Sequence, residues 1–166
     1  MKNLLMFTRP QKEPRNSIDL NRLIADVMRL REYEQRVNNI KVKINFDDNL
    51  PPIVADSLQL QQVFLNIILN AEHAMLDSHN GGTLTITTKT ADDNIIISFA
   101  DDGPGIDKEC LPKIFNPFFT TKDVGVGSGL GLSICYGIIK AQNGRIYVES
   151  ELGHGTEFII EMARSY

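Results

Sequence analysis

Apolar residues recur along this chain with two periods, the helical period and the alternating period of a strand. The helical period predicts three long helices at about 20–37, 56–79 and 129–142. Asp19 and Asp56 are candidate N-caps of the first two, and Asp56 stands three residues before a glutamine, near the spacing of a capping box. The apolar stripes are Leu20, Leu23, Ile24, Val27 and Leu30 in the first helix, and Val63, Phe64, Ile67, Ile68, Ala71 and Met75 in the second.

Alternation of apolar and polar residues predicts five strands, at about 40–46, 84–88, 95–99, 145–151 and 156–163. A short polar turn joins the second strand to the third, and a turn containing two glycines joins the last two. Strands and helices that are mixed in this way predict an α+β fold. We expect a two-layer α/β sandwich, in which a mixed, mostly antiparallel sheet carries the helices on one face.

Three further segments lack a clear period. Residues 8–16 are polar, contain two prolines and are predicted to be a linker. Residues 101–128 are rich in glycine and proline, with a short helix expected near 107–113. The chain has 166 residues, which suits one domain with a short attached segment.

Composition and charge narrow the classes of function. Hydrophobic residues make up 42% of the chain, enough for a core, and a net charge of −4 gives no electrostatic case for nucleic acid. Cys110 and Cys135 lack metal or redox spacing, so a reduced, cytoplasmic setting is expected. No apolar run approaches the roughly 20 residues of a membrane span. No membrane contact is therefore predicted from this segment.

Polar residues lie on one face of the second helix. Asn66 and Asn70 are four residues apart, and His73 extends the same face. The apolar stripe occupies the opposite side, so these side chains point into a cleft. An amide oxygen is a suitable neutral ligand for Mg²⁺ when phosphates supply the charge. The alternative is that both asparagines only bridge backbone groups inside the fold.

A turn of the form DxGxG follows the third strand. Asp101 ends a buried strand, and Gly103 and Gly105 build the turn after it. A carboxylate in this place can accept a hydrogen bond from the exocyclic amine of adenine, whereas guanine presents a carbonyl oxygen at that edge. The alternative is an ordinary Asp-Gly turn.

Glycines alternate from Gly125 to Gly131. The segment matches neither a P-loop nor a dinucleotide-binding fingerprint. It leads into the third helix, and a glycine loop at a helix N-terminus is a site for anions. A mobile linker has the same composition, but the position between Asp101 and a helix favours phosphate.

A phenylalanine pair and a lysine stand at the edge of this glycine-rich region. Phe118 and Phe119 are either a partner surface or anchors that hold the loop to the core. Lys122 either reaches a phosphate or is a solvated charge. His79 and His154 neighbour turns and are expected to be structural or solvated.

The order of these segments resembles a known family. Five segments resemble, in order, the motifs of the ATP-binding domain of two-component sensor histidine kinases. They are the asparagine box (62–75), the first glycine box (101–106), the phenylalanine box (114–122), the second glycine box (125–132) and the last Gly-Thr turn (153–157). That domain belongs to the GHKL ATPase/kinase superfamily. The resemblance covers residues 17–164, and the residues Phe118-Phe119-Thr120-Thr121-Lys122 and Gly129-Leu130-Gly131-Leu132-Ser133-Ile134-Cys135 are most similar to the nitrogen-regulation-type subgroup.

The resemblance implies ATP and Mg²⁺ as cofactors and assigns residues to the base. Asp101 is expected to bind the adenine amine, with Gly103 in the same glycine box. Gly105 and Ile106 are expected to pack beside the base. Thr156 is expected to complete the adenine contact through water.

The resemblance also assigns residues to the phosphates. Asn70 is expected to ligate the metal and Asn66 to support the phosphate network, which makes these two the expected catalytic residues. His73 is expected to contact phosphate, and residues 116–128 to form a lid over ATP. Lys122, within that lid, is counted with the nucleotide-binding residues from the sequence itself. The residues expected along the phosphates are Gly127, Ser128, Gly129, Leu130 and Gly131.

One feature of the family is missing. Histidine kinases carry a phosphoacceptor histidine on a dimerisation helix, but this chain has three histidines, and none precedes the ATP-binding segment. Residues 1–16 are expected to be the remnant of a dimerisation helix and its linker, and 17–164 the catalytic domain. The expected partners are a histidine-bearing dimerisation domain and, through the full-length protein, a response regulator. We expect the isolated chain to be monomeric and its parent, soluble or membrane-anchored, to be a homodimer.

Three functions compete. The first is a kinase domain that transfers the γ-phosphate to a histidine on a separate dimerisation domain. The second is an ATP-hydrolysing clamp, as in other GHKL branches, which carry a glutamate one turn before the metal-binding asparagine. Here that position is Asn66, and an amide is a poor general base. The third is a nucleotide-gated interaction module without chemistry of its own.

Overall fold

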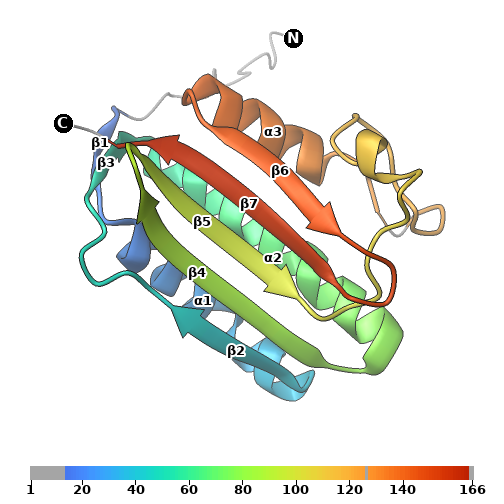
Figure 1. The fold of residues 1–166 in the computed structure, drawn as a ribbon. Helices are drawn as coiled ribbons and strands as arrows, with labels where there is room; N and C mark the ends of the chain where they lie inside the picture. The colour runs from blue at the N-terminus through green and yellow to red at the C-terminus, as the bar shows by residue number, and fades with distance from the viewer. Residues whose placement is uncertain (1–13, 126, 165–166) are drawn as a thin grey trace, which may run out of the picture.

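The computed structural model describes residues 14–125 and 127–164. Its main sheet has the strand order β2-β4-β5-β7-β6, with β2 and β4 parallel and the other neighbours antiparallel. The helices lie on one face of this sheet, and the other face is open (Figure 1). The predicted two-layer sandwich is therefore confirmed. The elements are β2 (Ile40–Asn45), β4 (Gly82–Ala91), β5 (Asn94–Asp101), β6 (Arg145–Ser150), β7 (Thr156–Ala163), α1 (Leu20–Val37), α2 (Ser57–His79) and α3 (Gly131–Ala141).

The central helix α2 fills the core as its pattern predicts, because its whole apolar stripe is buried. Its N-cap is Asp56, whose side chain accepts a hydrogen bond from the Gln59 N–H at 3.1 Å. The second bond of a capping box does not form. Instead the Asp56 N–H donates to Oε1 of Gln142, beyond the end of α3, at 3.2 Å. The cap therefore also joins two helices.

The buried face of α1 differs from its prediction in the last two turns. Leu30 is 70% exposed, although it was expected in the apolar stripe. The buried face continues instead through Arg31 and Gln35, which contact the buried carboxylate of Glu72 on α2. Arg31 donates to Glu72 Oε2 from Nη2 at 2.7 Å, and Gln35 donates to Oε1 at 2.7 Å. A polar cluster thus completes the interface between α1 and α2.

Two short strands were not predicted. β1 (Asn16–Ile18) and β3 (Ile53–Ala55) pair antiparallel in a separate sheet. Asn16 was expected in the linker, and most of that linker lies outside the described residues. Strands of three residues carry too few positions for alternation to be visible.

Two predicted helices are shorter than expected. The helix near 107–113 is only a 3₁₀ turn, η1 (Leu111–Lys113). α3 begins at Gly131 rather than Gly129, because Gly129 has φ +68° and packs against the Phe118 backbone. In the part of the chain that is described, no helix is both long and apolar enough to cross a membrane.

Candidate nucleotide-binding site

Helix α2 brings the predicted segments together, because three of them contact its polar face. Asn66 donates from Nδ2 to the carbonyl oxygen of Gly131 at 3.4 Å, at the start of α3. Lys122 contacts His73, with Nζ 3.2 Å from Nδ1. Gly103 lies against α2 where a Cβ atom would come within 3.4 Å of Ala74. The asparagine helix is thus a common wall for the first glycine turn, the lid and the glycine loop.

Asp101 and Thr156 form one end of this site. They lie directly opposite each other on β5 and β7, and they are 9% and 8% exposed. Burial is the largest influence on the Asp101 carboxyl and raises its pKa from 3.8 to about 6. The N–H groups of Gly103 and Thr156 oppose this shift, and the charge of Asp102 adds to it. At neutral pH the carboxylate is therefore a desolvated acceptor, poised for a donor on a ligand.

Two of the glycines at this end are required by close backbone approach. Gly105 and Gly155 have φ values of +76° and +84°. A Cβ atom would overlap the carbonyl of Glu151 at the first position and the carbonyl of Asp101 at the second. The two turns can therefore close around the end of β5 only with glycine in these places.

One residue at this end was missed by sequence reasoning. The hydroxyl of Ser150 accepts a hydrogen bond from the Ile106 N–H at 2.8 Å and donates to the Gly155 carbonyl oxygen at 2.8 Å. Its oxygen also lies 2.9 Å from the Thr156 hydroxyl. The only available signal was the hairpin register, which places Ser150 opposite Thr156.

The other end of the site, around Asn70 and His73, has fewer hydrogen bonds. Asn70 is half-buried, and its side chain has no hydrogen-bond partner among residues 14–125 and 127–164. His73 is exposed. Because the Lys122 ammonium can only donate, Nδ1 of His73 is the acceptor in this contact. Asn66 also contacts the Cys135 thiol, whose pKa is raised to about 11, mainly by burial.

The glycine loop ends at an open helix terminus. No side chain caps α3, whose N-cap position is Leu130. The Leu130 N–H points to the Ser128 hydroxyl at 3.3 Å, and Gly127 lies beside the Lys122 side chain. The first amides of α3 therefore have no side-chain partner among the described residues, and the predicted anion site at this terminus stays a prediction.

A comparison with protein families decides what kind of domain this is. Residues 55–165 match the family described as histidine kinase-, DNA gyrase B-, and HSP90-like ATPase. The chain belongs to this ATPase family. The match includes the asparagine helix, both glycine segments and the last Gly-Thr turn, so the motifs of the site are those of an ATP-binding domain.

Relatives place the domain within the histidine kinase branch of this family. The sensor kinase CckA of Brucella abortus (strain 2308) is 40% identical over 181 residues, which cover 99% of this chain and 18% of that protein. The nucleotide-free catalytic domain of histidine kinase ThkA has a TM-score of 0.80 at 35% identity, over 91% of this chain and 98% of that one. The domain is homologous to the catalytic domains of sensor histidine kinases, and the hydrolysing clamp is not favoured.

Two further structures show molecules that related kinases bind. Full-length ShkA, solved in complex with AMPPNP, has a TM-score of 0.79 at 30% identity, over 91% of this chain and 32% of that one. ThkA was also solved with the response regulator protein TrrA, with a TM-score of 0.76 at 32% identity, over 91% of this chain and 42% of that one. The chain spans about a fifth of the length of the curated relative CckA.

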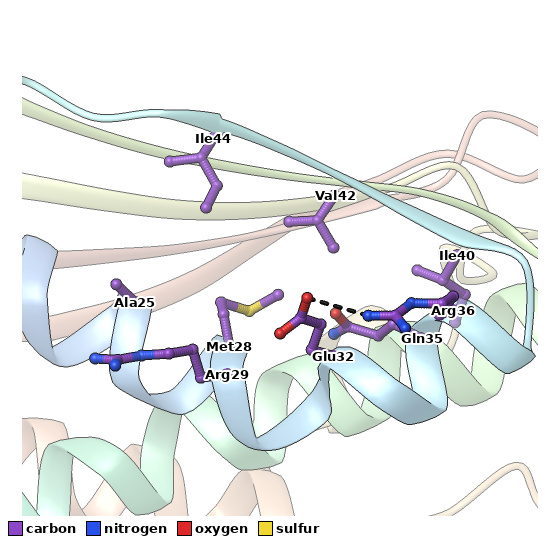
Figure 2. A pocket seen from close by; sticks show the side chains of 9 residues that line it. All are labelled: Ala25, Met28, Arg29, Glu32, Gln35, Arg36, Ile40, Val42 and Ile44. Carbon is purple, nitrogen blue, oxygen red and sulfur yellow. Dashed lines mark hydrogen bonds and ion pairs between the residues drawn. The ribbon is translucent and has the colours of Figure 1, made fainter.

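Two hollows of similar size lie on this ATPase-family domain. One, of about 400 Å³, lies between α1 and β2, where Ile40, Val42 and Ile44 point toward the helix (Figure 2). Its nine lining residues include none of the predicted site residues. The other, of about 410 Å³, is lined by Asp101 and Thr156 and also by Ser150. The second is lined by residues from both faces of the sheet, since Ala100, Glu149 and Glu157 alternate with Asp101, Ser150 and Thr156 along β5, β6 and β7. Neither hollow includes a residue of α2 or of the segment 116–128, so the candidate site is defined by the contacts at α2 and not by a hollow.

The paired phenylalanines have different roles. Phe119 is half-buried and packs against the core. Phe118 is 75% exposed and has φ +66°, with its N–H donating to the Gly129 carbonyl oxygen at 2.9 Å. One ring therefore anchors the loop, and the other is presented to solvent.

Proposed function

We propose that this domain binds ATP with Mg²⁺ and transfers the γ-phosphate to a histidine on a separate dimerisation domain. The observation that carries this proposal is that one site has a buried carboxylate at the end of β5 and, on α2, an amide without a hydrogen-bond partner in the described part of the chain. Asp101 selects the adenine amine, and Asn70 is left to ligate a cation. Residues 17–164 form this catalytic domain.

The residues at Asn70 fit Mg²⁺. An amide oxygen is a hard, neutral ligand, and Mg²⁺ in phosphate sites usually takes one or two protein oxygens and keeps several waters. Asn70 would supply one such oxygen, and the ion would neutralise charge on the transferred phosphate. Lys122 and His73 would hold the same phosphates from the lid and from α2, and the α3 amides would bind them through the glycine loop.

Transfer is favoured over hydrolysis by the residue at position 66. Its amide already donates to the Gly131 carbonyl, and it cannot take a proton from water. Bound ATP therefore lacks a positioned general base at this point of α2. Phosphoryl transfer then depends on an acceptor that is held in line by another domain.

The partners follow from the same reasoning and from the relatives. The ThkA complex with TrrA supports a response regulator as the partner of the parent protein. We assign Phe118 as a candidate docking residue for the dimerisation domain. The parent is a homodimer of the nitrogen-regulation-type subgroup, and this domain works in the cytoplasm, where ATP is present.

Calorimetry and labelled ATP test this function. The chain should bind ATP and ADP in a Mg²⁺-dependent manner, with GTP much weaker. With γ-labelled ATP, the chain alone should show neither appreciable self-labelling nor fast hydrolysis. Addition of the parent's histidine-bearing dimerisation domain should yield an acid-labile label on that domain.

The outcomes separate the three competing functions. Fast phosphate release by the isolated chain would identify an ATPase. Nucleotide binding without any labelled dimerisation domain would identify an interaction module. An acid-labile label that appears on the isolated chain as fast as in an intact kinase would contradict the separate-acceptor proposal.

A further inference from the structure

Ser150 connects three parts of the base end of the site. Its hydroxyl lies within 2.8 to 2.9 Å of the Ile106 N–H, the Gly155 carbonyl oxygen and the Thr156 hydroxyl. Strand register places Ser150, Thr156 and Asp101 side by side across β6, β7 and β5. Side chains directly opposite one another on antiparallel strands lie on the same face of the sheet. The serine is therefore linked to Asp101 through one residue, Thr156.

Counting protons fixes the direction of each bond. A serine hydroxyl has one proton and two acceptor lone pairs. Its proton goes to the Gly155 carbonyl oxygen, which can only accept. The Ile106 N–H can only donate, so it takes one lone pair. The Thr156 hydroxyl must then donate to the second lone pair, and the hydrogen-bonding capacity of Ser150 is full.

This arrangement changes what Thr156 offers to a ligand. Its only proton is committed to Ser150, so its oxygen retains lone pairs and no donor. Asp101, opposite on β5, is also an acceptor when ionised. The base end thus presents two acceptors side by side. Two acceptors suit the two protons of an exocyclic amine, and they leave a carbonyl oxygen at the same position without a donor.

We propose that Ser150 is a specificity-determining residue that makes Thr156 an obligate acceptor and so excludes bases with a carbonyl oxygen at the amine position of adenine. This inference rests on the proposed function, because it takes Asp101 and Thr156 as the base contacts. A donor at Thr156 would satisfy the carbonyl oxygen of hypoxanthine or guanine. Ser150 acts by keeping that proton away from the base, without touching the base itself.

The test compares ATP with ITP, which differs from ATP only at the reading edge of the base. In Ser150→Ala the Thr156 proton is released and can turn to the ligand. We expect the ratio of the ATP and ITP dissociation constants to shift toward ITP by about tenfold. Calorimetry measures both constants, and thermal unfolding with circular dichroism confirms that the variant is folded.

Three variants separate proton direction from a structural effect. Thr156→Val removes the hydroxyl at nearly constant volume, so Ser150→Ala should cause no further change of the ratio in that background. Ser150→Thr keeps the hydroxyl and should keep the wild-type ratio. Ser98→Ala, on the open face of the sheet, is the matched control and should change neither constant. If Ser150→Ala does not fold, Ser150→Cys, whose thiol accepts weakly, replaces it.

Two results would overturn the inference. Equal weakening of ATP and ITP in Ser150→Ala would show that the serine only holds the turns together. The same shift of the ratio in the Thr156→Val background would show that it does not act through Thr156. Neither result affects the proposed function, which fails instead if the wild-type chain binds no ATP.

Discussion

The two ends of the nucleotide site are built differently. At the base end, Asp101 and Thr156 are buried, their turns are closed by glycine, and the Ser150 hydroxyl is saturated with hydrogen bonds. At the phosphate end, Asn70 has no side-chain partner in the described part of the chain, and the lid is held to α2 by the contact between Lys122 and His73.

The two ends therefore differ in whether their side chains are ordered before the ligand binds. The base end of the proposed site is buried and hydrogen-bonded without a ligand, and burial raises the pKa of Asp101. At the phosphate end, Asn70 keeps an unused amide in the described part of the chain. We therefore expect specificity for the base to be preorganised and the catalytic geometry to be completed only on binding.

The largest expected effect is at the phosphate end. Asn70→Ala removes the proposed metal ligand and should reduce transfer to a supplied dimerisation domain on the order of 1,000-fold. The fold should persist, because Asn70 faces the site rather than the core. Transfer of label from γ-labelled ATP measures this, with the exposed Asn45→Ala as a matched control. Full transfer by Asn70→Ala would rule out Asn70 as the metal ligand.

A smaller but opposite pair of effects is expected at the base end. Asp101→Asn should weaken ATP binding by about 2–3 kcal/mol, because a charge-assisted bond is lost. The same change should stabilise the unliganded domain at pH 7. A pKa that rises from 3.8 to about 6 costs the folded state up to about 3 kcal/mol when the carboxyl is ionised. Calorimetry and denaturant unfolding measure the two effects, and unchanged ATP affinity would contradict the role of Asp101.

The pH dependence of ATP binding should distinguish the ends further. The folded-state pKa of Asp101 lies above its unfolded value, so its contribution to stability is fully present below pH 3.8 and is lost as pH rises through about 6. ATP needs the ionised carboxylate. Affinity should therefore fall by at most about tenfold per pH unit below pH 6. In Asp101→Asn this carboxyl is gone, so the variant should lose the fall in ATP affinity that its protonation causes. Identical pH profiles of ATP affinity for the wild type and Asp101→Asn would exclude Asp101 as the titrating group.

The smallest expected effect concerns order rather than energy. Lid amides between residues 116 and 128 should exchange rapidly without nucleotide and slow several-fold with ATP and Mg²⁺. The amides of Gly103, Ile106 and Thr156 should be protected in both states. Hydrogen exchange with peptide resolution measures this. A lid that is equally protected with and without ATP would remove the difference between the ends.

Periodicity predicted most of the scaffold but only the apolar part of its packing. The stripe of α2 and the order of the main elements were confirmed, since each is encoded by local spacing. In α1, however, Leu30 is exposed, and Arg31 and Gln35 continue the buried face. A stripe of apolar residues cannot reveal a buried charge whose partner, Glu72, is 41 residues away.

The sequence by itself determined the family, the order of its motifs and the residues proposed to bind ATP, because short motifs carry their own backbone and side-chain chemistry. Only the tertiary structure decided that Phe119 anchors the lid while Phe118 is exposed, and that Ser150 completes the base end. These depend on which strands lie side by side and which loops close on them. The physical reason is that a hydrogen bond or a buried ring is defined by its partner, and distant partners meet only in the folded chain.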